Sequence, residues 1–221
     1  MTCLAVLFML MTVAAWGQRS ANAGGEDEAV LQMRKVERAW TGKTLRVTSN
    51  NRNARIRDFA KAFCSQYKGY KPNACMMEYL KNPGGNSYEE KPYLVDDAPR
   101  NGYIKCDMRW QCEYMTEICY WRRPNGHSLV GVLMQKGFES GRNEYLLMFY
   151  DFDPSTNVMT PDMSALNSVN RQINRHHTGS PVVHLPKEGK NISVMCFNYN
   201  VDEGQDPDAD MFEVKWTGNG F

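Results

Sequence analysis

Apolar and polar residues alternate with two different periods along this chain, and the change falls near residue 100. Before it, apolar residues recur every three to four positions over 29–40 and 56–67, which predicts two amphipathic helices. Pro72 suits the first turn of a third, shorter helix over Asn73–Leu80. The turn residues Asn82-Pro83-Gly84-Gly85 end this helical part of the chain.

Beyond residue 102 the period is two. From Ile104 to Tyr114 apolar residues hold the even positions and polar residues the odd ones, which predicts a strand with one buried face. The phase shifts by one near Met115, which we interpret as a bulge or bend in one long strand that continues to Trp121. Pro124-Asn125-Gly126 predicts a hairpin turn, and 128–135 and 144–151 the next two strands of an antiparallel meander.

The C-terminal part is less regular. We expect a short helix over 164–172, irregular structure over 173–190, and strands over 192–199 and 211–216. Helices first and strands later predict an α+β fold, in which N-terminal amphipathic helices pack on a mostly antiparallel β-meander sheet. The length suits a single α+β domain over 24–221, with its helical part at about 29–82 and its sheet at about 102–221.

An apolar run, Cys3–Ala15, precedes the predicted domain. Two small-x-small sites follow it, at 15–17 and 21–23, so residues 1–23 read as a secretory signal peptide cut after Gly17 or Ala23. No Lys or Arg precedes the run, which leaves the true start codon open and keeps a buried N-terminal helix as the alternative. We therefore expect an exported protein of the periplasm, outer envelope or extracellular space, with no transmembrane segment after cleavage.

Charge limits the class of partner, and the cysteines raise the question of disulfides. The chain carries 26 basic and 25 acidic residues and no basic block, which predicts neither a nucleic-acid nor a membrane-surface partner. Six cysteines remain after cleavage, so either disulfides or buried free thiols are open, and Cys64–Cys75 is the favoured disulfide pair. Histidine and cysteine are not grouped at zinc-site spacing, and we expect no cofactor.

Aromatic residues crowd the predicted meander. If the strands carry aromatics on both faces, one helical layer cannot bury them all, and the rest would form a binding surface for a protein, peptide or glycan. The candidate ligand-binding residues are Tyr103, Trp110, Tyr120, Trp121 and Tyr150. The alternative is a sheet covered on both sides, with these rings in its core.

Two weaker patterns suggest chemistry. Asp151, Asp153 and Asn157 have the spacing of calcium ligands, although Thr156 stands where such a loop needs glycine, and a turn capped by its own side chains is favoured instead. His176, His177 and His184 would supply the base of a secreted hydrolase with Ser180 or a cysteine as nucleophile. No nucleophile motif accompanies them, so no catalytic residue is assigned.

A resemblance rests on three strings: Cys119-Tyr120-Trp121-Arg122-Arg123-Pro124-Asn125-Gly126-His127, Phe149-Tyr150-Asp151-Phe152-Asp153-Pro154 and Met159-Thr160-Pro161. Together with Asn101-Gly102-Tyr103-Ile104, they look like uncharacterised exported proteins of anaerobic Gram-negative gut bacteria. The resemblance covers about residues 54–162. It implies an envelope or secreted location and carries no catalytic residues.

The sequence thus favours a non-enzymatic, exported binding or interaction domain of the cell envelope. One alternative is a secreted hydrolase that uses the His176–His184 loop. Another is an envelope inhibitor of a lysozyme or protease, which would present a rigid hairpin at Arg123–His127.

Overall fold

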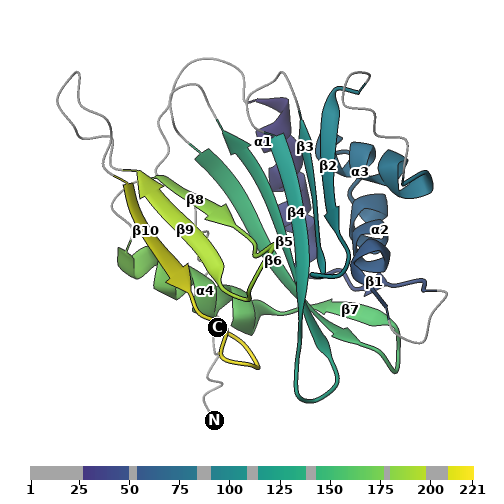
Figure 1. Cartoon of the computed structure of the whole chain (residues 1–221). Helices are drawn as coiled ribbons and strands as arrows, with labels where there is room; N and C mark the ends of the chain where they lie inside the picture. The colour runs from purple at the N-terminus through teal and green to yellow at the C-terminus, as the bar shows by residue number, and fades with distance from the viewer. Residues whose placement is uncertain are drawn as a thin grey trace, which may run out of the picture.

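A computed structural model describes residues 27–49, 54–83, 91–108, 114–137, 143–176, 180–197 and 209–221. Three helices form the N-terminal part: α1 (Glu28–Trp40), α2 (Ile56–Gln66) and α3 (Lys71–Lys81) (Figure 1). The periodicity predicted all three within a few residues, because each helix buries one apolar stripe. The Asp27 carboxylate caps α1 by accepting a hydrogen bond from the Ala29 N–H at 2.9 Å.

Seven antiparallel strands form the large sheet, in the order β1-β7-β6-β5-β4-β3-β2. Their bounds are β1 (Leu45–Arg46), β2 (Tyr93–Ala98), β3 (Tyr103–Met108), β4 (Tyr114–Arg122), β5 (Ser128–Gly137), β6 (Asn143–Asp153) and β7 (Val158–Pro161). Strands β2 to β7 follow the chain as a meander, which confirms the predicted sheet. The short β1 closes one edge by pairing with β7.

The predicted bulge near Met115 is wrong. The run over 104–121 is two strands, β3 and β4, which pair antiparallel with Cys106 opposite Thr116. The apparent phase shift arises because both faces of β4 are covered. Ile118, like Ile104 of β3, lies in the first core, whereas Met115, Cys119 and Trp121 lie in the second.

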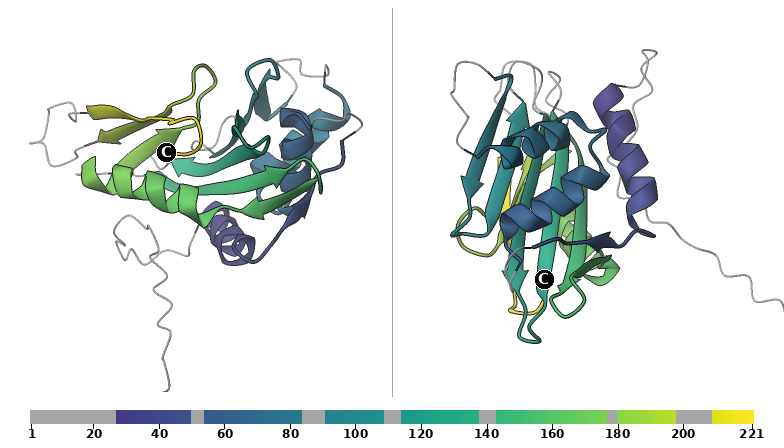
Figure 2. Two further views of the ribbon diagram at one scale, coloured as in Figure 1. Left: turned by 90° about the horizontal axis from the view of Figure 1, so that it is seen from below. Right: turned by 90° about the vertical axis from the view of Figure 1, so that its right-hand side faces the viewer.

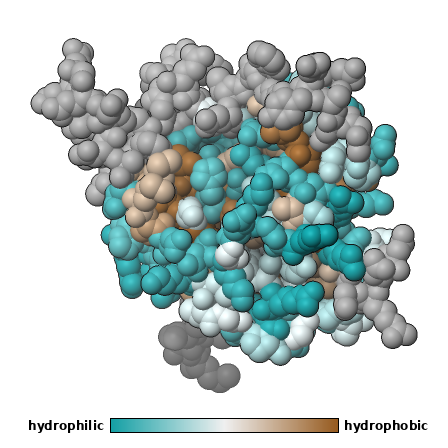
Figure 3. All heavy atoms as spheres, viewed as in Figure 1, coloured by the Kyte–Doolittle hydropathy of each residue, from teal (hydrophilic) through white to brown (hydrophobic). Residues whose placement is uncertain are grey.

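A second unit lies on the other face of the large sheet. Helix α4 (Met163–His176) is followed by β8 (Ser180–His184), β9 (Ile192–Phe197) and β10 (Ala209–Val214), which form a separate three-stranded antiparallel sheet. The segment 173–190 is therefore more ordered than the sequence predicts, since it contains the end of α4 and all of β8. Apolar side chains reach the surface over β9 and β10 (Figure 3), where Met211 is 70 % exposed.

Two cores result, one on each face of the large sheet. The first lies beneath α1, α2 and α3 and includes Trp40, Phe59 and Tyr150. The second lies beneath α4 and the small sheet and includes Trp121 and Phe149. The views in Figure 2 show α2 and α3 separated from the small sheet by the strands of the large sheet. Coverage of both faces, which was the alternative to an exposed aromatic face, is the observed arrangement.

The favoured disulfide does not form. Cys64 and Cys75 are both free thiols, as are Cys106, Cys119 and Cys196 among the described residues. Met76 rather than Cys75 holds the inward position of α3, and its sulfur lies 3.6 Å from the Cys64 thiol. Burial raises the pKa of the Cys64 thiol, so it packs as a small apolar side chain. Within the described ranges, no helix is long and apolar enough to cross a membrane.

Candidate functional site

The aromatic residues proposed as a binding surface are core residues wherever they are described. Tyr103 and Trp121 are buried in the second core and Tyr150 in the first. Trp110 lies outside the described residues. Buried rings cannot meet a ligand, so Tyr103, Trp121 and Tyr150 do not form the predicted binding face.

Tyr120 and Trp121 point to opposite faces of β4, as their adjacent positions predict. The Tyr120 ring is half-buried and packs edge-on against Phe59, with ring centroids 5.3 Å apart. The same ring covers Gly102, whose positive φ of 71° and lack of a Cβ allow this close approach. Both residues are therefore engaged in packing, one on each side of the sheet.

The polar residues gather instead at the base of the β4–β5 hairpin. Gly126 adopts a φ of 85°, and the backbone N–H of Arg123 donates to the carbonyl of His127 at 2.9 Å. The Asn125 side chain accepts a hydrogen bond from the His127 N–H at 3.0 Å. This three-residue loop, Pro124–Gly126, is exposed at its tip and fixed at its base.

Arg123 fixes that base to three other segments. Its guanidinium pairs with the Asp151 carboxylate of β6, donates to Asp162 at 2.7 Å, and donates to the Asn219 carbonyl at 3.0 Å. Asp162 in turn accepts a hydrogen bond from the Ala165 N–H, at the start of α4, at 2.9 Å. The Arg123 side chain is only 12 % exposed, so these partners compensate the cost of burying its positive charge.

His127 and Asp151 form an oriented pair beside this arginine. The Nδ1 of His127 lies 2.6 Å from Asp151 Oδ2, and its Nε2 lies 3.9 Å from Asp153 Oδ1. A carboxylate at Nδ1 favours the tautomer with its proton on that nitrogen, which leaves Nε2 as a hydrogen-bond acceptor on the neutral ring. The imidazole is 32 % exposed and therefore accessible to a ligand.

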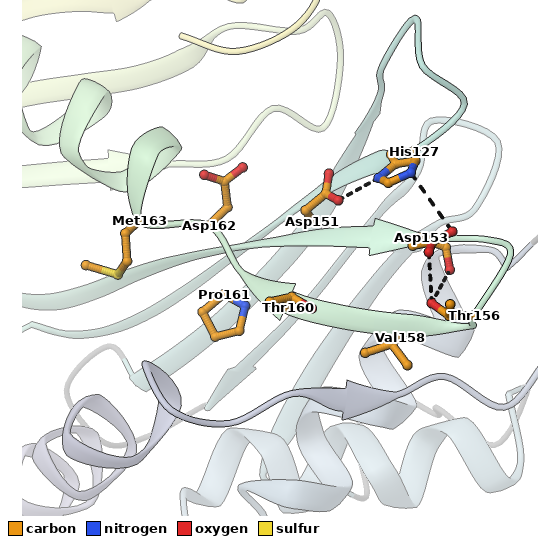
Figure 4. Close-up of a pocket in the computed structure, with 9 residues that line it drawn as sticks. All are labelled: His127, Asp151, Asp153, Thr156, Val158, Thr160, Pro161, Asp162 and Met163. Carbon is orange, nitrogen blue, oxygen red and sulfur yellow. Dashed lines mark hydrogen bonds and ion pairs between the residues drawn. The ribbon is translucent and has the colours of Figure 1, made fainter.

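These residues line an open depression along β7, which we call the β7 depression. Figure 4 shows His127, Asp153 and Thr156 at one end, Asp162 and Met163 at the other, and Val158, Thr160 and Pro161 between them. Its volume is about 600 Å³. The lining combines apolar side chains with fixed hydrogen-bond acceptors, which suits an amphipathic ligand.

The residues considered as calcium ligands form the turn between β6 and β7. Asp153 accepts hydrogen bonds from the Ser155 N–H and hydroxyl, each at 2.7 Å, and from the Thr156 hydroxyl at 3.0 Å. These bonds, with the nearby His127, hold the pKa of Asp153 below its usual value. Asn157 has a φ of 56° and donates its N–H to the Asp153 carbonyl.

This geometry corresponds to the turn capped by its own side chains. Asp151 is turned toward Arg123 and His127 instead of toward Asn157. Over the described ranges, no three His, Cys, Asp or Glu side chains come together as a metal site.

The histidines of the hydrolase alternative lie elsewhere. His184 Nδ1 is 3.1 Å from the carboxylate of Glu117, a buried residue of β4, and His176 packs against the Phe212 ring. His177 is outside the described residues. In the part of the chain that the structure describes, neither His176 nor His184 lines the β7 depression or hydrogen-bonds to a serine, threonine or cysteine. His184 beside the buried Glu117 supplies the histidine–carboxylate pair that a hydrolase needs. Among the described residues, no nucleophile is hydrogen-bonded to this histidine.

Sequence reasoning did not select Arg123 and His127 as a polar site, although it singled out both the hairpin and Asp151. Strand register supplies the missing link, because Ser128 pairs with Phe152 and Leu129 with Asp151. The same register, continued by one pair beyond Ser128 and Phe152, brings position 127 next to position 153. Counting the residue pairs of β5 and β6 outward to position 127 would have placed His127 beside the two aspartates.

Comparison with known proteins identifies no relative of this chain. No family model, curated protein or solved structure matches the chain. The resemblance to exported proteins of gut bacteria stays a prediction.

Proposed function

We propose that this chain is a non-enzymatic exported binding domain that holds an extended segment of a protein or peptide partner in the β7 depression. The observation that carries the proposal is the fixed pair His127–Asp151 at the end of an open, partly apolar depression. Groups already held by hydrogen bonds lose little freedom on binding, so they favour recognition.

The shape and chemistry of the depression support an extended ligand. Its lining follows β7 from Thr156 to Met163, so the apolar contacts are distributed along a strand and not around a closed cavity. At one end of the depression, His127 Nε2 can accept a hydrogen bond from an amino or amide nitrogen of the ligand, next to the negative charge of Asp153, 3.9 Å away. A peptide with an apolar stretch and a hydrogen-bond donor at one end is the ligand we infer.

Selection of displayed random peptides on the full chain tests this proposal. Peptides enriched on the wild type are expected to bind His127→Ala about tenfold more weakly, because a hydrogen bond to a charged or oriented group is lost. His176→Gln, an exposed histidine remote from the depression, is the matched control and should bind as the wild type does. Enriched peptides that bind both variants and the wild type equally would contradict the β7 depression as the site.

Export is proposed on the apolar run at 3–15 and the two small-x-small sites, which lie outside the described residues. The mass of the protein recovered from cells that produce the full chain tests it. Mature chains that begin at Gln18 or Gly24 support export, and a chain that retains Met1 in the cytosol contradicts it.

An inhibitor that presents the Arg123–His127 hairpin is the second candidate. The rigid base of this hairpin favours it, since Arg123 and His127 together contact β6, the start of α4 and the C-terminal segment. Ion pairs hold the loop in place of the disulfide that an inhibitor loop commonly has. Inhibition of lysozyme or trypsin by the full chain, lost on replacing Pro124-Asn125-Gly126 with three alanines, would support this candidate over the first.

A further inference from the structure

The charge of this chain is divided unequally between its two parts. Residues 28–82 carry 12 Lys and Arg against 4 Asp and Glu, a net charge of +8. Residues 83–221 carry 13 Lys and Arg against 19 Asp and Glu, a net charge of −6. The near-zero total therefore conceals a strongly basic segment, and the expectation of a poor membrane-surface binder rested on that total.

The fold gathers the basic segment on one side of the molecule. Helices α1, α2 and α3 pack on the same core, and β1 joins the sheet beside them (Figure 2, right). Their apolar stripes face inward, so the charged residues between the stripes face solvent. We call this surface, formed by residues 28–49 and 54–82, the basic helical layer.

The cations of the basic helical layer are exposed. Lys35 and Arg38 lie on α1, and Lys43 follows its end. Lys61 lies on α2, while Lys68 and Lys71 flank the turn from α2 to α3. Within the described residues, none of these six side chains takes part in an ion pair, whereas Arg57 pairs with Asp97 at 2.7 Å and Arg34 also has a partner.

The acidic residues of this layer are already engaged. Asp58 accepts hydrogen bonds from the Arg55 N–H at 2.9 Å and from the Ser49 hydroxyl at 3.0 Å. Glu78 pairs with Lys91, which lies outside the basic segment, at 2.8 Å. Glu28 binds Gln32, and Glu37 also has a partner. The layer thus presents a surplus of positive charge that nothing in residues 28–82 neutralises.

We propose that the basic helical layer adsorbs to the headgroup surface of an anionic phospholipid bilayer. The cations are distributed over three helices and not converged on a pocket, which suits an extended anionic surface. Large exposed apolar side chains among the described residues are Met163 and Met211, and neither belongs to this layer. Binding is therefore electrostatic, without insertion of apolar side chains into the bilayer. The choice of a lipid surface over nucleic acid rests on the export proposed above, because an exported protein meets anionic headgroups in the envelope.

Co-sedimentation of the full chain with vesicles tests the inference. Vesicles of phosphatidylcholine with about 30 % phosphatidylglycerol are expected to bind the protein at low salt, and pure phosphatidylcholine vesicles are not. Raising the salt to about 0.5 M is expected to release it, because such a salt concentration screens charges within a few ångströms.

Two triple variants with the same change in net charge locate the surface. Lys61→Gln/Lys68→Gln/Lys71→Gln is expected to weaken partitioning about a hundredfold, at about fivefold for each cation that contacts the surface. Arg171→Gln/Lys190→Gln/Lys215→Gln, which removes exposed cations outside the layer, should change it much less. Circular dichroism checks that both variants fold.

Three outcomes overturn the inference. The first is equal binding to neutral and anionic vesicles, and the second is equal weakening by the two triple variants. The third is preferential binding of a short duplex DNA over anionic vesicles at the same salt concentration, which would assign the layer to nucleic acid.

Discussion

A single arginine connects four segments that lie far apart in the sequence. Arg123 reaches Asp151, Asp162 and the Asn219 carbonyl while its side chain stays largely buried. Replacing such a guanidinium with an apolar side chain removes the cation that Asp151 and Asp162 share. The hairpin, β6, the start of α4 and the C-terminal segment therefore share one electrostatic anchor.

Arg123→Ala is expected to lower the free energy of unfolding by about 2–3 kcal/mol, since its hydrogen bonds to two carboxylates are lost, and Asp151 keeps only His127 and Asp162 only the Ala165 N–H. Urea denaturation measures the change. Arg122→Ala, the exposed neighbour on the same hairpin, is the control and should stay within about 0.5 kcal/mol of the wild type. A loss equal to the control would show that the anchor contributes nothing to stability.

At this scale the sequence predicted which segments matter but not which atoms meet. It selected the hairpin at Arg123–His127 and the pair Asp151 and Asp153 as separate features. These features come together through the register in which β5 pairs with β6, and no local pattern in the sequence specifies that register. The aromatic residues failed as a site for a similar reason, because burial on the second face comes from distant segments.

Among the elements, α1 depends on an unusual cap. Asp27 accepts hydrogen bonds from the Ala29 N–H and, at 2.9 Å, from the Tyr114 hydroxyl of β4, and it lies 3.7 Å from the Lys136 ammonium of β5. Burial opposes ionisation of Asp27, but these bonds and this charge outweigh it, and the pKa of the carboxyl is lowered from 3.8. The cap thus also attaches the helix to the sheet.

A carboxyl with a lowered pKa in the folded state stabilises the protein above its ordinary pKa and loses that contribution as the pH falls below it. Asp27→Ala is expected to cost about 1 kcal/mol at pH 7, a typical value for loss of an N-cap. The difference from the wild type should shrink below about pH 4, where the carboxyl takes up a proton. Thermal unfolding at both pH values measures it, with Glu28→Ala as the control; a difference independent of pH would contradict the assigned role.

The helices were predicted well and several strands were not. Helical stripes are local, since one face repeats within 11 to 13 residues. Strands β1, β2, β7 and β8 have between two and six residues, too few to establish an alternation. In β5 nine of ten residues are buried, which erases the alternation, so this strand was predicted from the hairpin turn before it.

On the scale of the whole molecule, a buried carboxylate joins the two sheets. The carboxylate of Glu117 of β4 lies 3.1 Å from Nδ1 of His184, the last residue of β8. It also accepts a hydrogen bond at 2.8 Å from the N–H of Leu185, the residue after β8. Lys105 of β3 lies 4.0 Å away. The small sheet is thereby attached to the large one by polar contacts as well as by the second core.

Glu117→Ala is expected to destabilise the protein by about 3 kcal/mol, because it leaves the buried Leu185 N–H without its acceptor and removes the carboxylate beside His184. Glu117→Gln retains one acceptor for Leu185 and should recover part of the loss. Guanidinium denaturation compares both with Glu188→Ala, an exposed residue of the loop after β8. Equal stability of all three variants would exclude Glu117 as a link between the sheets.

The overall class was accessible from the order of elements alone, whereas the second layer was not. Helices before strands predicted the α+β fold, and β5 and β6 lie where they were expected, although the reversal between β3 and β4 was missed. Nothing in a local pattern indicates that β9 and β10 leave the large sheet to build a separate one. The separate sheet forms because its strands bury apolar surface against α4 and the large sheet.

The position of β5 has a consequence for how this molecule opens. The strand has neighbours on both edges and a core on each face. Its amides therefore reach solvent only when the large sheet separates, and their hydrogen exchange should be the slowest in the chain. Segments on either side of this strand can detach without it, but β5 itself is released only by global unfolding.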